Sequence, residues 1–308
     1  MLIGILAGLA TCALWGLTFI APRAVEPFTA WDLTVARYGI FGLASGLLML
    51  HRRFRPTGIP RNQIAIGLSL GGLGYVGYFV CAAYAVKWAG GALPPLIIGT
   101  MPVIMALIAN RREQVAEWRH LVLPLAMIGA GLLIVNLATV AWASETDRDD
   151  ALLGTIMAVA ALSIWVAYGL TNGAVMRSTN APDALRWTGL QGLGAAIGSV
   201  ALLPLTSLGE ASADLGNFTA WTLIMGLAGS WLATWFWVVS SRNLPLTLAA
   251  QLIVAETVFG LLYGFLYEEL WPNPSEWIGC TLQIIGVCLG IRVLTLATKQ
   301  NGRIAPAV

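Results

Sequence analysis

The chain has 308 residues, of which 58% are hydrophobic and only 10% are charged, and its formal net charge is +2. A soluble domain carries about 25% charged residues, so this composition excludes an ordinary soluble enzyme or nucleic-acid-binding protein and indicates a polytopic membrane protein. The four cysteines lie within apolar runs, where they are expected to pack as small side chains rather than to form disulfides or bind a metal.

Ten apolar runs are long enough to form membrane-spanning helices. Their connections are short and leave no room for a soluble domain. The N-terminal run lacks the basic segment that opens a signal peptide, so it is interpreted as the first span. We therefore predict an all-α membrane protein with ten transmembrane helices, at residues 2–21, 31–50, 63–86, 92–110, 119–142, 152–175, 185–207, 217–240, 246–267 and 275–297.

The charges of the connections predict the orientation of these spans. Residues 51–61 contain four arginines and residues 110–119 contain three, whereas acidic residues gather in 144–150 and 268–276 on the opposite side. With ten alternating spans, thirteen of the 17 basic residues fall on one side. The positive-inside rule places that side, with both termini, in the cytoplasm.

The two halves of the chain resemble each other. Residues 10–25 align with 160–175 at an offset of 150, and residues 90–107 align with 245–262 at an offset of 155. Because each half has five spans, an odd number, the second half must enter the membrane from the other side. This predicts an inverted-topology repeat, which is typical of transporters with a site near the midplane; chance similarity between two apolar halves is the alternative. The predicted units are a first repeat at 1–143, an inverted second repeat at 150–298 and a cytoplasmic tail at 299–308.

Several motifs, in their order and spacing, carry a resemblance to a known family. They are "LWG" at 14–16, "ARYG" at 36–39, "TMPV" at 100–103, Glu113, and "AETVFGLLYGFLYEE" at 255–269. On these motifs, and over nearly its whole length, the chain resembles the drug/metabolite transporter superfamily in its ten-helix EamA-type branch. Its richness in Trp and Tyr is most similar to exporters of aromatic and other neutral amino acids, the YddG type.

The resemblance implies a secondary transporter of the inner (plasma) membrane that exports amino acids or related small metabolites by alternating access. The expected partners are the small-molecule substrate and the lipid bilayer, without nucleic acid and without a cofactor; a monomer is compatible with this interpretation. A drug or other metabolite carrier on the same scaffold remains the alternative. An intramembrane enzyme and a purely structural subunit remain more remote alternatives, and coupling to a proton or another ion is left open.

A membrane path for a polar solute requires polar and aromatic groups on inward-facing stripes of helices. Such stripes recur at helical spacing in the first, third, sixth and eighth predicted spans, with helix–helix packing as the alternative for each. Tyr and Trp faces attract an ammonium group and stack on aromatic substrates. The candidate pathway residues on these stripes are Trp15, Tyr75, Tyr78, Trp165, Tyr168, Ser230, Thr234 and Trp237.

The fourth and ninth spans carry further candidates. Three prolines interrupt residues 92–110, and freed backbone groups next to a wet cavity are what a pathway can use, so Pro95, Gly99 and Thr100 are predicted to line it. In the ninth span Thr257 stands where the family often has proline, so less of a kink is expected there. Glu256 lies near the middle of that span and is a candidate to bind a substrate ammonium or a proton, or to serve as a structural acid. Gln251 is a further candidate pathway residue. Together with Gln191 and Gln283 it is also expected to form interhelical hydrogen bonds, and Arg37 is expected to hold helices together or reach the outer interface.

Overall fold

The computed structural model describes residues 1–89, 93–140, 148–207, 214–269, 271 and 273–300. All regular structure in these residues is helical, as predicted. Thr29 and Asp32 form a capping box at the start of α3, and the Asp183 side chain caps α10. The main helices are α1 (Leu2–Gly16), α2 (Ala21–Ala24), α3 (Ala30–Leu48), α4 (Arg61–Ser69), α5 (Tyr78–Ala89), α6 (Leu93–Ile98), α7 (Met101–Glu113), α8 (Trp118–Val140), α9 (Arg148–Met176), α10 (Ala184–Val200), α11 (Leu215–Leu223), α12 (Ala233–Asn243), α13 (Leu246–Leu252), α14 (Val254–Glu268) and α15 (Pro274–Gln300).

Seven helical segments among the described residues are long and apolar enough to cross a membrane. The predicted spans at 31–50, 92–110 and 185–207 are not among the seven. They coincide with α3, with the broken pair α6–α7, and with α10, which stops at Val200 before a 3₁₀ turn at Leu203–Leu205. The multi-pass, all-helical character is therefore established, whereas the count of ten spans stays a prediction.

The break in α6–α7 has a local cause. Proline at 102 has no N–H group, and its ring crowds the carbonyl four residues earlier, so the helix ends at Ile98 and restarts at Met101. The ninth predicted span is also interrupted, at Ile253 between α13 and α14, although no proline stands there. Both the fourth and the ninth predicted spans are therefore broken. The smaller kink expected in the ninth span does not mean that its helix is continuous.

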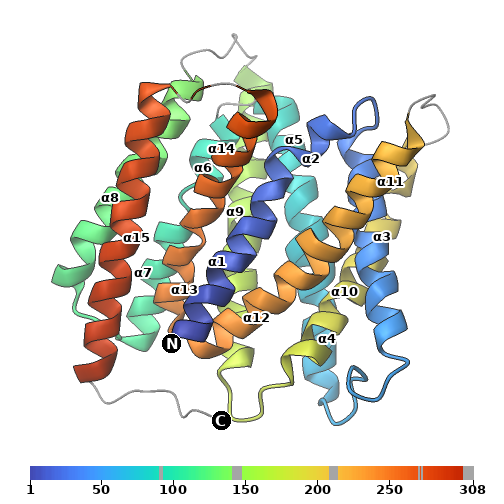
Figure 1. Ribbon diagram of the computed structural model, residues 1–308, viewed down its shortest axis with the longest axis horizontal. Helices are drawn as coiled ribbons and strands as arrows, with labels where there is room; N and C mark the ends of the chain where they lie inside the picture. Colours follow the sequence, from blue (N-terminus) through green and yellow to red (C-terminus); the bar gives the residue numbers. More distant parts are fainter. Residues whose placement is uncertain (90–92, 141–147, 208–213, 270, 272, 301–308) are drawn as a thin grey trace.

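Helices of one half pack against helices of the other half. The contacting pairs include α3 with α10, α5 with α9, α7 with α13, α8 with α15, and α1 with α12 and α14. Figure 1 shows α8 and α15 side by side at the left of the bundle. The core therefore lies between the halves rather than within each one.

Three local features recur at matching positions of the two halves. π-helical segments, in which N–H groups bond to the carbonyl five residues back, cover Leu70–Gly77 between α4 and α5 and Ile224–Leu232 between α11 and α12. Left-handed residues end α7 at Gln114 (φ 48°) and α14 at Glu269 (φ 54°). The third feature is the break in the preceding helix, after Ile98 in one half and at Ile253 in the other.

Both ends of the helical bundle can be followed in Figure 1. α1 begins and α15 ends at the lower end, where the arginine-rich connections α3–α4 and α7–α8 also lie. α14 ends and α15 begins at the upper end. The basic connections thus share one end of the molecule.

Candidate functional site

Six aromatic side chains from α1, the first π segment, α5, α9 and α12 meet between the halves. The Trp165 ring centroid lies 5.4 Å from that of Trp15, 5.0 Å from Tyr78 and 4.9 Å from Tyr168. Trp15 also lies 5.9 Å from Trp237, and Tyr75 lies 5.2 Å from Tyr168. We call these six residues the aromatic cluster; the stripes predicted from four separate spans converge here. The cluster consists of Trp15, Tyr75, Tyr78, Trp165, Tyr168 and Trp237.

A hydrogen-bond network joins one side of the aromatic cluster to the surrounding helices. The Tyr75 hydroxyl lies 2.6 Å from the Tyr168 hydroxyl and 2.9 Å from Thr234 Oγ1. Tyr168 donates to Gln191 Oε1 at 2.9 Å, and Gln191 Nε2 donates to Asn172 Oδ1 at 3.3 Å. All five residues are buried, so these contacts are the partners that their polar groups need inside the bundle. The interhelical role expected of Gln191 is confirmed.

Arg37 on α3 reaches the second π segment. Its Nε donates to Ser230 Oγ at 2.7 Å, and its Nη2 donates to the carbonyl of Gly229 at 2.9 Å. Its Cζ lies 5.2 Å from the ring centroid of Tyr38. Arg37 therefore holds α3 to the π segment, which confirms its expected helix-joining role, and Ser230 is the partner of an arginine.

Glu256 lies in the first turn of α14, just after the break at Ile253. The residue as a whole is half-buried, and its carboxylate lies within electrostatic range of Arg37 and Tyr78. The Cys12 thiol donates to the carbonyl of Leu252 at 3.2 Å, so α1 satisfies a carbonyl that the break releases. The positive end of the α14 dipole also favours a negative charge in this turn.

The structure does not bring every predicted residue to the aromatic cluster. Thr100 and Val103 face α8, where with Gly129 they line a cavity of about 140 Å³. Gln251 lies against α15 so closely that a Cβ on Gly290 would overlap its Oε1. The reason is helix direction: the breaks turn these positions toward the neighbouring helix. Gly99 separates α6 from α7, and the side chain of Pro95 lies outside the described residues.

The hydrogen bonds expected of two glutamines are not found. Neither the amide oxygen nor the nitrogen of Gln251 has a hydrogen-bond partner in the described part of the chain, and the same holds for Gln283. Both side chains are buried, so that prediction is wrong for these two residues. Close packing on glycines of α8 and α15 explains their position: Gln283 lies over Gly131, as Gln251 does over Gly290.

A second polar contact joins the halves at the lower end of the bundle. Glu113 at the end of α7 pairs with Arg177 just after α9, with an Oε1–Nη2 distance of 2.6 Å. Its other oxygen, Oε2, accepts from the backbone N–H of Leu246 at the start of α13, at 2.9 Å. We call this arrangement the Glu113 bridge; one carboxylate thereby links the first half to two elements of the second.

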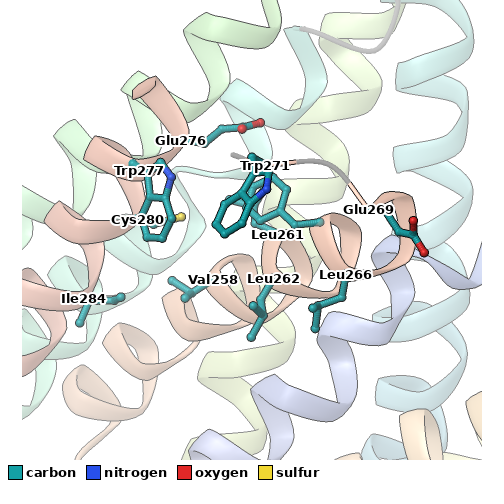
Figure 2. A pocket seen from close by; sticks show the side chains of 11 residues that line it. Val258, Leu261, Leu262, Leu266, Glu269, Trp271, Glu276, Trp277, Cys280 and Ile284 are labelled. Carbon is teal, nitrogen blue, oxygen red and sulfur yellow. The ribbon is translucent and has the colours of Figure 1, made fainter. Parts of the chain in front are cut away.

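An apolar cavity of about 480 Å³ lies apart from this site, between α14 and α15. Figure 2 shows Leu262 and Trp277 on facing sides of it and Trp271 above it. Trp271 is 89% exposed. Apart from Glu269 and Glu276 its lining is apolar or sulfur-containing, so this cavity suits hydrophobic groups rather than polar ones.

Sequence reasoning missed two aromatic residues of the site. Tyr38 is buried with its ring centroid 6.1 Å from that of Tyr75, and Trp187 is fully buried and donates from Nε1 to Asn172 Oδ1 at 2.9 Å. Tyr38 follows Arg37 in the "ARYG" motif, which was a usable signal. No group of three metal-ligating side chains occurs in the described ranges.

Comparison with known proteins gives consistent matches. A model of the EamA-like transporter family matches residues 2–137 and again residues 152–292. The inner membrane protein YtfF of Escherichia coli (strain K12) is 28% identical over an aligned length of 320, and the alignment covers 95% of this chain and 96% of YtfF. A solved crystal structure with 18% identity has a TM-score of 0.74 and covers 94% of this chain and 98% of that one, which shows a shared fold.

Proposed function

Because the chain belongs to the EamA-like transporter family, we propose that it is a secondary transporter of the inner membrane that exports aromatic and other neutral amino acids, or related small metabolites, by alternating access. The members of this family are described as transporters, which favours a transporter over an intramembrane enzyme. The inner-membrane assignment follows the description of YtfF together with the seven apolar helices of this chain.

One observation carries the proposal: the aromatic cluster lies where the two halves meet. Trp15 and Tyr75 come from the first half, and Trp165 and Trp237 come from the second. Substrate sites of transporters built from repeats lie at the repeat interface near the bilayer midplane. A packing role alone would not require hydroxyl and indole groups, whose burial costs free energy unless they are hydrogen-bonded.

Aromatic walls suit an amino acid. A Trp or Tyr face attracts an ammonium group by about 1–2 kcal/mol when water is excluded, and it stacks on an aromatic side chain. The indole N–H of buried Trp237 has no hydrogen-bond partner among the described residues, so it is a donor that a substrate carboxylate or carbonyl can use.

Alternating access between inverted repeats is the proposed mechanism. The matched π segments, the helix breaks and the left-handed caps at Gln114 and Glu269 support two equivalent five-helix units. The shared end of the basic connections supports a cytoplasmic location for both termini. Reporters fused after residues 57 and 147 test the orientation: we expect the first inside the cytoplasm and the second outside, and the reverse pair of results would overturn it.

The substrate class is tested by uptake of a panel of labelled amino acids into proteoliposomes that contain the purified protein. We expect saturable uptake of aromatic and other neutral amino acids, and a loss of uptake in Trp165→Ala at equal protein content. Uptake of no amino acid would refute the amino-acid assignment.

A hydrophobic, drug-like solute is the second candidate, and the apolar cavity between α14 and α15 is the observation that favours it. Adding lipophilic cations to the panel separates the two. If Trp277→Ala changes transport of the cations while Trp165→Ala does not, the drug carrier becomes the better assignment.

A further inference from the structure

Three polar side chains lie at the edge of the aromatic cluster, on three different helices. They are Arg37 on α3, Tyr78 on α5 and Glu256 on α14, and all three are half-buried, whereas the rest of the cluster is buried. Glu256 interacts electrostatically with both of the others. Arg37 and Glu256, both described, do not come within the 4.0 Å of an ion pair. Two opposite charges thus lie within electrostatic range of each other without forming an ion-pair contact.

The geometry of Arg37 leaves one edge of its guanidinium for a ligand. The group has five N–H donors, and the bonds to Ser230 and Gly229 use one on Nε and one on Nη2. These bonds fix the side edge of the guanidinium. The adjacent end edge, formed by the remaining N–H groups of Nη1 and Nη2, can bind a carboxylate with two parallel hydrogen bonds.

Glu256 is positioned to bind a positively charged group. No hydrogen bond from the described residues occupies its carboxylate, and an ionised acid inside a spanning helix is unfavourable unless a positive or polar group compensates it. Tyr78 stands within electrostatic reach of this carboxylate, and its ring packs on Trp165. An ammonium group between Glu256 and these rings would receive both an ionic and a cation–π contact.

We propose that Arg37 and Glu256 form a clamp for a zwitterion, with Arg37 binding the α-carboxylate and Glu256 the α-ammonium of one substrate molecule. This inference rests on the proposed transport of amino acids and deepens it. The substrate side chain then lies against Tyr78 and the aromatic cluster. Specificity for the head group comes from the two charges, and the aromatic rings tolerate several side chains.

Three related probes test the clamp with the purified full-length protein. They are phenylalanine, phenylalaninamide, which lacks the carboxylate, and N-acetylphenylalanine, which lacks the ammonium. Calorimetric titration should show that the wild-type protein binds each analogue roughly tenfold or more weakly than phenylalanine, because each leaves a charged partner unmatched.

The variants should separate the two ends of the clamp. In Arg37→Gln the preference for phenylalanine over the amide should fall to within about threefold, while the preference over the N-acetyl compound remains. In Glu256→Gln the preference for phenylalanine over the N-acetyl compound should fall, while the preference over the amide remains. Arg242→Gln and Glu117→Gln change exposed charges and should keep both wild-type preferences. The preferences are ratios within one protein preparation, so partial unfolding does not mimic the result.

Two results would overturn the clamp: wild-type preferences retained in both clamp variants, or no binding of phenylalanine to the wild-type protein. If Arg37→Gln does not fold, the test depends on Glu256→Gln alone. This variant leaves the bonds of Arg37 to Ser230 and Gly229 intact and replaces the carboxylate by an isosteric amide. The proposed function fails separately, if the uptake panel contains no transported amino acid.

Discussion

Neutralising Glu113 should open the lower end of the protein. Glu113→Gln keeps an oxygen for the N–H of Leu246 but removes the charge that pairs with Arg177. The two side chains are 21% and 27% exposed. Exposed ion pairs contribute up to about 1 kcal/mol, whereas breaking a buried pair costs about 3–5 kcal/mol. At this burial we expect a loss of about 2 kcal/mol from the state that contains the Glu113 bridge, roughly a 30-fold shift toward states without it.

A buried thiol measures this shift. Thr247 lies in the first turn of α13 and is fully buried, and Thr247→Cys introduces a thiol without added bulk, since it replaces the hydroxyl and omits one methyl group. In a background in which the four free cysteines are replaced, the reaction of this thiol with a water-soluble reagent should become roughly 30-fold faster in Glu113→Gln, because opening precedes reaction.

The control for this experiment is another ion pair of the same length. Glu117 and Arg119 are also 2.6 Å apart, but their side chains are 64% and 74% exposed. Glu117→Gln should therefore leave the rate unchanged. Equal rates in wild type and Glu113→Gln would refute the bridge as a closing contact, and equal acceleration by both variants would point to net charge instead.

Other substitutions should separate packing from transport. Tyr75→Phe removes a hydroxyl bonded to Tyr168 and Thr234 and should lower the free energy of unfolding by about 1–3 kcal/mol. Tyr78→Phe keeps the ring that packs on Trp165 and should leave the melting temperature unchanged; equal melting temperatures of the two variants would contradict the first part. Gly194→Ala places a Cβ against the Leu68 carbonyl and should destabilise by about 1–3 kcal/mol, while Gly46→Ala meets no atom within 4 Å and should be neutral or stabilising, by up to about 1 kcal/mol; similar melting curves for the two would refute the close crossing of α10 with α4. Pro102→Ala should change the uptake rate more than the melting temperature, because neighbouring helices hold α7 in place; a large fall in melting temperature with unchanged uptake would give the break a structural role only.

The sequence predicted the helical class and the aromatic residues because both depend on local periodicity. Trp15 and Thr11 share a face of α1 through the i, i+4 rule, and so do Trp237 and Ser241 on α12. What periodicity cannot give is which stripes meet. The contact of Trp165 with residues of α1 and α5 depends on how the two halves dock, and the sequence carries no direct record of that docking.

The predicted residues that lie away from the aromatic cluster share one structural feature. Thr100 and Gln251 lie beside helix breaks, where a small change in backbone direction decides which neighbour a side chain faces. No proline in the sequence predicts the break at Ile253. The π segments also lack a sequence signal, since each is an ordinary apolar run, and the bonds that Arg37 makes to Ser230 and Gly229 exist only in the folded bundle.

The π segments also change what an insertion or deletion means in this protein. The π segment Ile224–Leu232 uses about one residue more than an α-helix needs for the same turn, so a one-residue deletion there would restore α-helical bonding and keep the flanking residues on nearly the same faces. Ser230, which hydrogen-bonds to Arg37, lies within this segment. Thr234, which hydrogen-bonds to Tyr75, follows it. A single gap here in an aligned relative therefore signifies loss of the π segment with the same faces turned toward the centre, whereas a gap elsewhere in the helix would rotate the residues beyond it by about 100°.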